Sequence, residues 1–153
     1  MSRYRGLFIL FFLSGISGLI YESIWSRYIR LFVGSAATAQ VLVLSLFMGG
    51  MSLGALIAAR KLSSVRSPVR TYGMIEGGIG IYALLFPTIA ELVMRLCYDS
   101  VFPAVGDPTM ISVIKWSMAA LMILPPCVLL GMTFPLMSAG ILRQEPHRSG
   151  EIL

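Results

Sequence analysis

Residues 7–34, LFILFFLSGISGLIYESIWSRYIRLFVG, decide the fold of this chain. The run from Leu7 to Ile20 carries no charge, and one carboxylate, Glu22, follows while the segment is still apolar. A helix needs about 20 mostly apolar residues to cross the roughly 30 Å of hydrocarbon in a bilayer. We therefore predict a transmembrane helix over residues 7–31.

The composition of the whole chain is that of an integral membrane protein. Of its 153 residues, 57% are hydrophobic and 12% are charged, with a mean hydropathy of +0.84. An ordinary soluble domain carries about 25% charged residues. The first apolar run is too long for a secretory signal and has no small-residue cleavage pattern before a polar domain. The net charge of +5 comes mostly from residues that flank apolar spans, so nucleic-acid binding is not indicated.

Four apolar spans predict an all-α fold, a polytopic membrane bundle of four transmembrane helices within a single domain, residues 1–153. The spans cover residues 7–31, 36–59, 71–97 and 111–142, joined by loops at 60–70 and 98–110 and followed by a tail at 143–153. The fourth span contains Pro125, Pro126 and Pro135. Each proline removes an N–H donor and clashes with the preceding turn, so we expect this helix to be kinked or broken. Such a break could line a substrate site, although most proline kinks are only structural.

The distribution of Lys and Arg predicts that both termini lie in the cytoplasm. Basic residues are more abundant on the side of the termini and of loop 60–70, which is the bias of cytoplasmic segments. Eight lie on that side, Arg3, Arg5, Arg60, Lys61, Arg66, Arg70, Arg143 and Arg148, against four on the other, Arg27, Arg30, Arg95 and Lys115. Loop 98–110 is then extracytoplasmic.

Small residues recur at four-residue spacing in three of the spans. In lipid, such pairs let helix backbones touch and dispersion contacts add up. The pairs are Ser14 with Gly18, Gly50 with Gly54, and Gly73 with Gly77. Tight helix packing is the simplest interpretation, and helices that slide or bend are the alternative.

Glu22 is the first candidate for a site, because a carboxylate inside an apolar helix normally faces protein or water rather than lipid. Helical spacing puts it on one stripe with Gly15, Gly18, Trp25 and Ile29. Buried charges need partners, so we expect Glu22 to face one of three basic residues, Lys115, Arg27 or Arg30.

Glu76 is the second intramembrane carboxylate, on a stripe with Gly73, Gly80 and Ala83. It lies near the cytoplasmic face, so its expected partners are Arg60, Lys61 and Arg70, and it should not form a dyad with Glu22. For both carboxylates we weigh a helix-to-helix tie against contact with a cation or polyamine. Glu91 and Arg95 have i,i+4 spacing and predict an interfacial ion pair of little energetic weight.

Metal and cofactor chemistry has little support in the sequence. Cys97 and Cys127 form no C-x-x-C motif, and the single histidine, His147, lies in the polar tail. The glycine cluster at 77–80 has no strand before it, so it does not predict a dinucleotide site. We expect no metal, no cofactor and no catalytic residue in this chain.

Four segments resemble the membrane part of bacterial multi-spanning proteins related to spermidine synthase. They are SGISGLIYESIWSRYIRLFVGS (14–35), LFMGGMSLGALIAARKLS (46–63), RTYGMIEGGIGIYALLFP (70–87) and GMTFPL (131–136). The resemblance implies a helix bundle in the bacterial inner membrane that precedes a cytoplasmic polyamine aminopropyltransferase-like domain. That domain's glycine-rich loop and acidic residues do not occur here, which implies a short member working with separate subunits, or a fragment. The glycines 49, 50 and 54 with Arg60 and Lys61 also resemble, more weakly, a half-repeat of major facilitator transporters.

Three functions remain open at this point. The first is a non-catalytic membrane module, an anchor or assembly subunit in a homo-oligomer or larger complex. The second is half of a small transporter or polyamine-binding channel working as a homo-oligomer, with a cavity lined by Glu22, Trp25 and the fourth span. The third is the membrane subunit of an aminopropyltransferase whose separate catalytic subunit lies elsewhere. In each case the lipid bilayer is the first partner, and this chain alone is expected not to be an enzyme.

Overall fold

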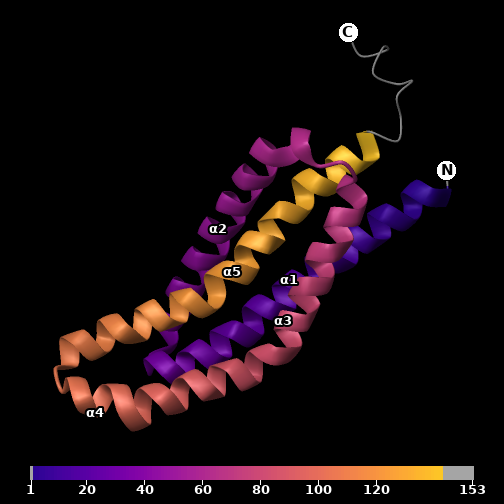
Figure 1. Ribbon diagram of the computed structural model, residues 1–153. Coiled ribbons are helices and arrows are strands. Elements are labelled where there is room, and N and C mark those ends of the chain that lie inside the picture. Colours follow the sequence, from indigo (N-terminus) through magenta and orange to yellow (C-terminus); the bar gives the residue numbers. More distant parts are fainter. Residues whose placement is uncertain (1, 143–153) are drawn as a thin grey trace.

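The computed structural model describes residues 2–142, and every regular element in that range is helical. The predicted all-α fold is therefore confirmed. Four long helices are joined by short helical turns (Figure 1). The elements are α1 Ser2–Val33, α2 Ala36–Lys61, η1 Leu62–Ser64, α3 Pro68–Leu96, η2 Cys97–Val101, α4 Phe102–Val105 and α5 Pro108–Leu142.

The long helices run alternately up and down the bundle (Figure 1). The start of α1 and the end of α5 lie at the same end as η1, which we call the η1 end. The α1–α2 link and α4 lie at the opposite end, which we call the α4 end. Short connections between sequential helices produce this antiparallel order.

Helix α5 is the centre of the bundle, because it packs against α1, α2 and α3. Its closest neighbour is α2, and glycines make that approach possible. A Cβ added at Gly54 would lie 1.9 Å from the Val128 carbonyl oxygen, and one at Gly131 would lie 2.0 Å from that of Met51. The two backbones are therefore in direct contact, as expected where helix association in lipid depends on close packing.

Aromatic side chains join α1 to α3 in the half of the bundle nearer the α4 end. Trp25 is 1% exposed and lies 5.7 Å from Phe86, measured between ring centroids. Tyr28 approaches the same ring edge-on, also at 5.7 Å. Such tilted and edge-on pairs are favourable beyond the apolar area that they bury. Trp25 thus belongs to the core of the bundle.

The prolines of the fourth span bend α5 without breaking it. The helix continues from Pro108 to Leu142 through Pro125, Pro126 and Pro135, and Figure 1 shows it changing direction partway along. A proline leaves the carbonyl four residues earlier without its donor. For Pro126 that carbonyl belongs to Met122, and the Tyr82 hydroxyl of α3 donates to it at 2.5 Å. Helix α3 also changes direction in Figure 1, and its interior proline is Pro87.

The connection between α3 and α5 differs from the loop expected at 98–110. A π-helical turn and α4 continue α3 to Val105, which leaves only Gly106 and Asp107 between helices. Gly106 takes a left-handed conformation, φ 68°, that glycine adopts at no steric cost. Asp107 then caps α5, its Oδ1 accepting from the Met110 N–H at 2.8 Å. The expected tail, 143–153, lies outside the described residues.

Candidate functional site

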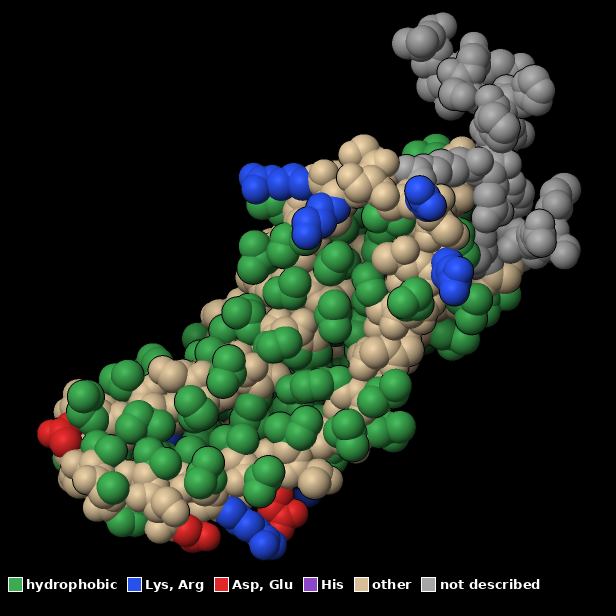
Figure 2. Space-filling view, viewed as in Figure 1, with side chains coloured by type: hydrophobic (Ala, Val, Ile, Leu, Met, Phe, Trp, Pro, Cys, Tyr) green, Lys and Arg blue, Asp and Glu red, His purple; other side chains and the backbone are tan. Residues whose placement is uncertain are grey.

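The surface is divided into an apolar middle and two charged ends. Figure 2 shows Lys and Arg side chains at the η1 end, and both acidic and basic side chains at the α4 end, with hydrophobic side chains between. Within residues 2–142, four segments are long and apolar enough to cross a membrane: Phe8–Val33, Ala36–Ser64, Pro68–Val105 and Pro108–Leu142. Such spans need a bilayer around them.

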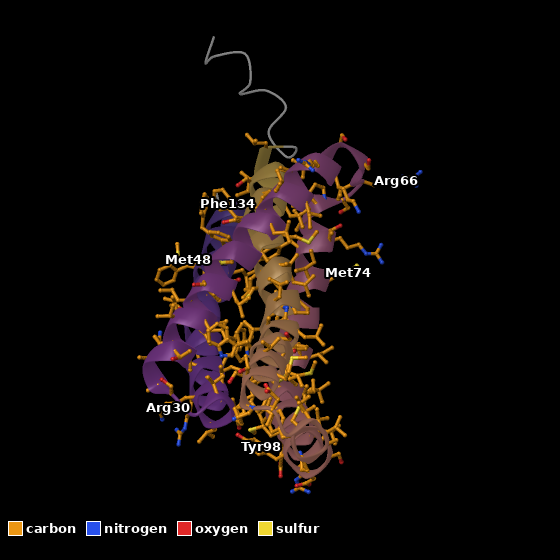
Figure 3. All side chains as sticks on the ribbon, turned by 90° about the vertical axis from the view of Figure 1, so that its left-hand side faces the viewer. Arg30, Met48, Arg66, Met74, Tyr98 and Phe134 are labelled. Carbon is orange, nitrogen blue, oxygen red and sulfur yellow. The ribbon has the colours of Figure 1, made fainter. Side chains whose placement is uncertain are left out.

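The η1 end is basic, whereas the α4 end carries charges of both signs. At the η1 end, Arg60, Lys61, Arg66 and Arg70 are all exposed, and Figure 3 shows Arg66 pointing away from the bundle. At the α4 end, the Arg95 guanidinium lies 2.6 Å from Glu91 Oε1, with side chains 72% and 60% exposed. This confirms the ion pair expected from the spacing, and its exposure makes its energetic contribution small.

Glu76 forms a tie between helices rather than the expected ion pair. The Ser14 hydroxyl of α1 donates a hydrogen bond to Glu76 Oε1 of α3. Buried Tyr72, one turn earlier on α3, interacts with both side chains. Among the described residues no salt bridge joins Glu76 to Arg60, Lys61 or Arg70. The expectation failed because Glu76 faces α1, whereas these basic side chains are exposed at the η1 end.

Glu22 lines a polar cavity of about 480 Å³ between α1 and the start of α2. Arg27 and Arg30, two of its three expected partners, line the same cavity. No salt bridge between Glu22 and either arginine occurs within the described part of the chain. The complete lining is Leu19, Glu22, Ser23, Ser26, Arg27, Arg30, Ala36 and Gln40.

Lys115, the third expected partner of Glu22, lies elsewhere. Its Nζ lies 5.2 Å from the centre of the Tyr98 ring and 5.3 Å from that of Phe102. A cation over an aromatic face is attracted by the ring quadrupole, so these rings replace the expected carboxylate. Trp25 does not line the Glu22 cavity either, because it is buried between Tyr21 and Phe86.

An apolar groove of about 960 Å³ lies farther along α1, towards the η1 end. Its lining comes from α1, α2 and α5 and includes Phe12, Phe47, Met51 and Phe134. Three hydroxyl residues also line it, but each is already bonded, Ser14 to Glu76, Ser52 to the Met48 carbonyl and Thr133 to the Leu130 carbonyl. The groove therefore suits an apolar occupant.

The small-residue pairs separate into packed and unpacked positions. Gly50 and Gly54 meet α5, and Gly18 makes ordinary contact with Leu130. Around Gly73 and Gly77 of α3, an added Cβ would meet nothing within 4 Å. These two glycines have no packing function within the described chain.

Metal-ligating residues are not clustered in residues 2–142, where no group of three His, Cys, Asp or Glu could hold an ion. Cys97 and Cys127 are free and buried in separate parts of the core. His147 lies outside the described residues.

Sequence reasoning overlooked Tyr82, Ser26 and Gln40. Tyr82 could have been found from Pro126, because a proline in an apolar span frees a carbonyl that a nearby hydroxyl can satisfy. Ser26 could have been found from its i+4 spacing to Glu22. Gln40 lies on another helix, and the sequence carries no signal that would place it beside Glu22.

The fold and its surface define a multi-pass membrane protein built around a lipid-embedded helix bundle. Comparisons with family models, curated proteins and solved structures gave no match to this chain. The likeness to the spermidine synthase-related family thus stays a prediction from the sequence.

Proposed function

We propose that this chain is a non-catalytic membrane assembly module that associates with a second copy of itself through α3. The observation that carries the proposal is the unpacked glycine face of α3. Gly73 and Gly77 are exposed and have no neighbour that a Cβ would meet. Glycine in a helix interior is less stable than alanine by about 1 kcal/mol, and no contact within the described chain compensates for it.

The same chain uses glycines for backbone contact where two of its own helices meet. Gly54 of α2 and Gly131 of α5 admit carbonyl oxygens that a Cβ would exclude. The glycine face of α3 is a surface of the same kind that meets no partner among the described residues. A small-x-x-x-small pair such as Gly73 and Gly77 favours close crossing of two transmembrane helices.

A second copy is the partner that fits this face best. Beside the glycines stands a ridge of large exposed side chains, Met74, Ile81 and Leu85, which are 71%, 63% and 52% exposed. This ridge and the glycine face lie next to each other on α3, because the members of each recur after one or two helical turns. Around a two-fold axis, the ridge of each copy can pack onto the glycine face of the other. A symmetric dimer requires this kind of self-complementary surface.

Cysteine crosslinking tests this arrangement with a matched control on the opposite side. Figure 3 shows Met74 and Met48 on opposite sides of the bundle, and both are well exposed, 71% and 59%. In a chain carrying C97A and C127A, Met74→Cys should give a disulfide-linked dimer in bilayers, whereas Met48→Cys should not. Crosslinking through Met48→Cys alone would reject the α3 face.

Glycine substitutions provide the second test. Gly77→Ile should reduce dimerisation, measured by single-molecule photobleaching in bilayers, because the isoleucine side chain occupies the glycine face of α3. Gly49→Ile on α2 is the matched control, since Gly49 is also exposed with nothing within 4 Å of an added Cβ. Equal dimerisation of both variants would contradict the proposal.

The orientation that we propose places the η1 end in the cytoplasm of a bacterial cell, in its inner membrane. The four exposed basic residues at that end support it, because cytoplasmic loops carry the excess of Lys and Arg. A fluorescent reporter inserted at Ser64 of η1 should then be cytoplasmic. A reporter that is labelled from outside the cell would reverse the topology.

A further inference from the structure

The polar cavity between α1 and α2 contains charged side chains that form no salt bridge within the described residues. Arg27 and Arg30 are exposed, and neither forms a salt bridge within the described residues. Ser26, which also lines the cavity, has a buried Oγ with no hydrogen-bond partner. Two guanidinium groups and one carboxylate give the lining a net charge of +1. Most of the hydrogen-bonding groups on these side chains are therefore donors.

The start of α2 adds to the positive potential of the cavity. Ala36, the first residue of this 26-residue helix, lines it, and Ser35 caps the helix by accepting from the Thr38 N–H. Unpaired N–H groups and the helix dipole favour an anion at such an end. Arginines beside a helix start present donors in the geometry that phosphate oxygens accept.

Counted along α1, Arg30 falls at the depth of lipid headgroups and Arg27 just inside that layer. Arg30 is three residues before the end of α1 at Val33, a rise of about 4.5 Å, and Arg27 is about 9 Å from that end. Headgroups occupy roughly 5 to 7 Å on each side of the hydrocarbon core. Figure 3 shows Arg30 pointing outward near the α1–α2 link. Because long basic side chains extend towards the interface, both guanidinium groups can reach headgroup phosphates.

The inner boundary of the cavity is apolar and is shared with the groove. Leu19 lines both the polar cavity and the 960 Å³ groove, and both lie along α1 and α2. A ligand with a phosphate at one end and a hydrocarbon chain at the other matches this succession of surfaces. A free phosphate would use only the polar part.

We propose that the seam between α1 and α2 binds an anionic phospholipid, with its phosphate at Arg27 and Arg30 and an acyl chain passing Leu19 into the groove. Glu22, at the inner end of the polar cavity, opposes the anion and lowers the affinity. A polyamine is disfavoured, because the two arginines repel it. This site lies on α1 and α2 and is independent of the proposed α3 dimer.

Native mass spectrometry of the purified full chain tests the site. Phosphatidylglycerol, phosphatidylethanolamine with the same acyl chains and inorganic phosphate are titrated separately. We expect phosphatidylglycerol to bind more tightly than phosphatidylethanolamine, and inorganic phosphate not to displace it. The double variant R27Q/R30Q should weaken phosphatidylglycerol binding by about 25-fold, because one basic side chain near an anionic surface contributes about fivefold.

Two further variants separate this site from general charge attraction and from misfolding. R66Q/R70Q removes the same charge from exposed residues at the η1 end and should leave binding unchanged. Glu22→Gln removes the opposing carboxylate and should tighten binding, by about fivefold. Equal binding by both arginine double variants, no tightening in Glu22→Gln, or displacement of the lipid by inorganic phosphate would each overturn the proposal.

Discussion

Tyr82 of α3 donates a hydrogen bond to the main-chain carbonyl oxygen of Met122 in α5, at an O···O distance of 2.5 Å. That carbonyl is the one for which Pro126 supplies no N–H. A tertiary contact thus replaces a missing helical hydrogen bond in the middle of a transmembrane helix. Such substitution allows α5 to stay continuous through its prolines.

Tyr82→Phe should destabilise the protein by about 1 to 3 kcal/mol, because the Met122 carbonyl loses its donor in a setting without water. In a Pro126→Ala background the same change should cost much less, because the alanine N–H restores the donor. A thermodynamic cycle measured by reversible unfolding in bicelles gives the coupling. Equal costs of Tyr82→Phe in both backgrounds would mean that the two residues act independently.

Ser14→Ala should also destabilise the bundle by about 1 to 3 kcal/mol, since it leaves Glu76 without the donor from α1. Glu76→Gln should cost less, because the amide oxygen can still accept. The matched control is Ser17→Ala, since the Ser17 hydroxyl bonds only to the Leu13 carbonyl of its own helix. If both serine variants unfold alike, the tie between α1 and α3 has no energetic weight.

Gly54→Ala should be far more disruptive than its small volume suggests. The added Cβ would lie 1.9 Å from a backbone oxygen of α5, so the helices must separate, and overpacking of this kind costs about 1 to 3 kcal/mol or more. Gly49→Ala, on the same helix with open space around it, should be neutral or stabilising by up to about 1 kcal/mol. Thermal unfolding in detergent compares the two, and similar melting temperatures would contradict the packing described.

Lys115→Met and Glu22→Gln should have additive effects on stability, because Lys115 lies over Tyr98 and Phe102 rather than beside Glu22. Lys115→Met alone should cost about 0.5 to 2 kcal/mol through loss of the cation–π contacts. The double variant, measured with both single variants by the same unfolding assay, checks additivity. A coupling well above about 0.5 kcal/mol would restore the ion pair expected from the sequence.

Most of the fold was predictable from local properties of the chain. The apolar runs around residues 7–31, 36–59, 71–97 and 111–142 correspond to the four long helices, because a bilayer demands length and hydropathy that can be counted along the sequence. The i,i+4 ion pair of Glu91 and Arg95 was predictable for the same reason. Both partners lie on one helix, so their spacing fixes their distance.

The candidate sites were only partly predictable. The sequence identified Glu22 and Glu76 as residues that need shelter, because the cost of a charge in hydrocarbon does not depend on the fold. The sequence predicted the wrong partners for Glu76 and for Lys115. The depth of a residue in the membrane does not determine how its helix is rotated about its own axis. Similarly, Gly54 and Gly77 belong to identical motifs, and only one of them meets another helix.

The sequence by itself determined the class of this protein and the number of its membrane spans, through hydropathy and charge. Only the tertiary structure decided which faces meet. Tyr82 reaches the carbonyl freed by Pro126, and Gln40 joins Glu22 in one cavity, through the rotation and crossing of helices distant in sequence. That rotation is fixed by side-chain packing among all the helices at once, which no local pattern contains.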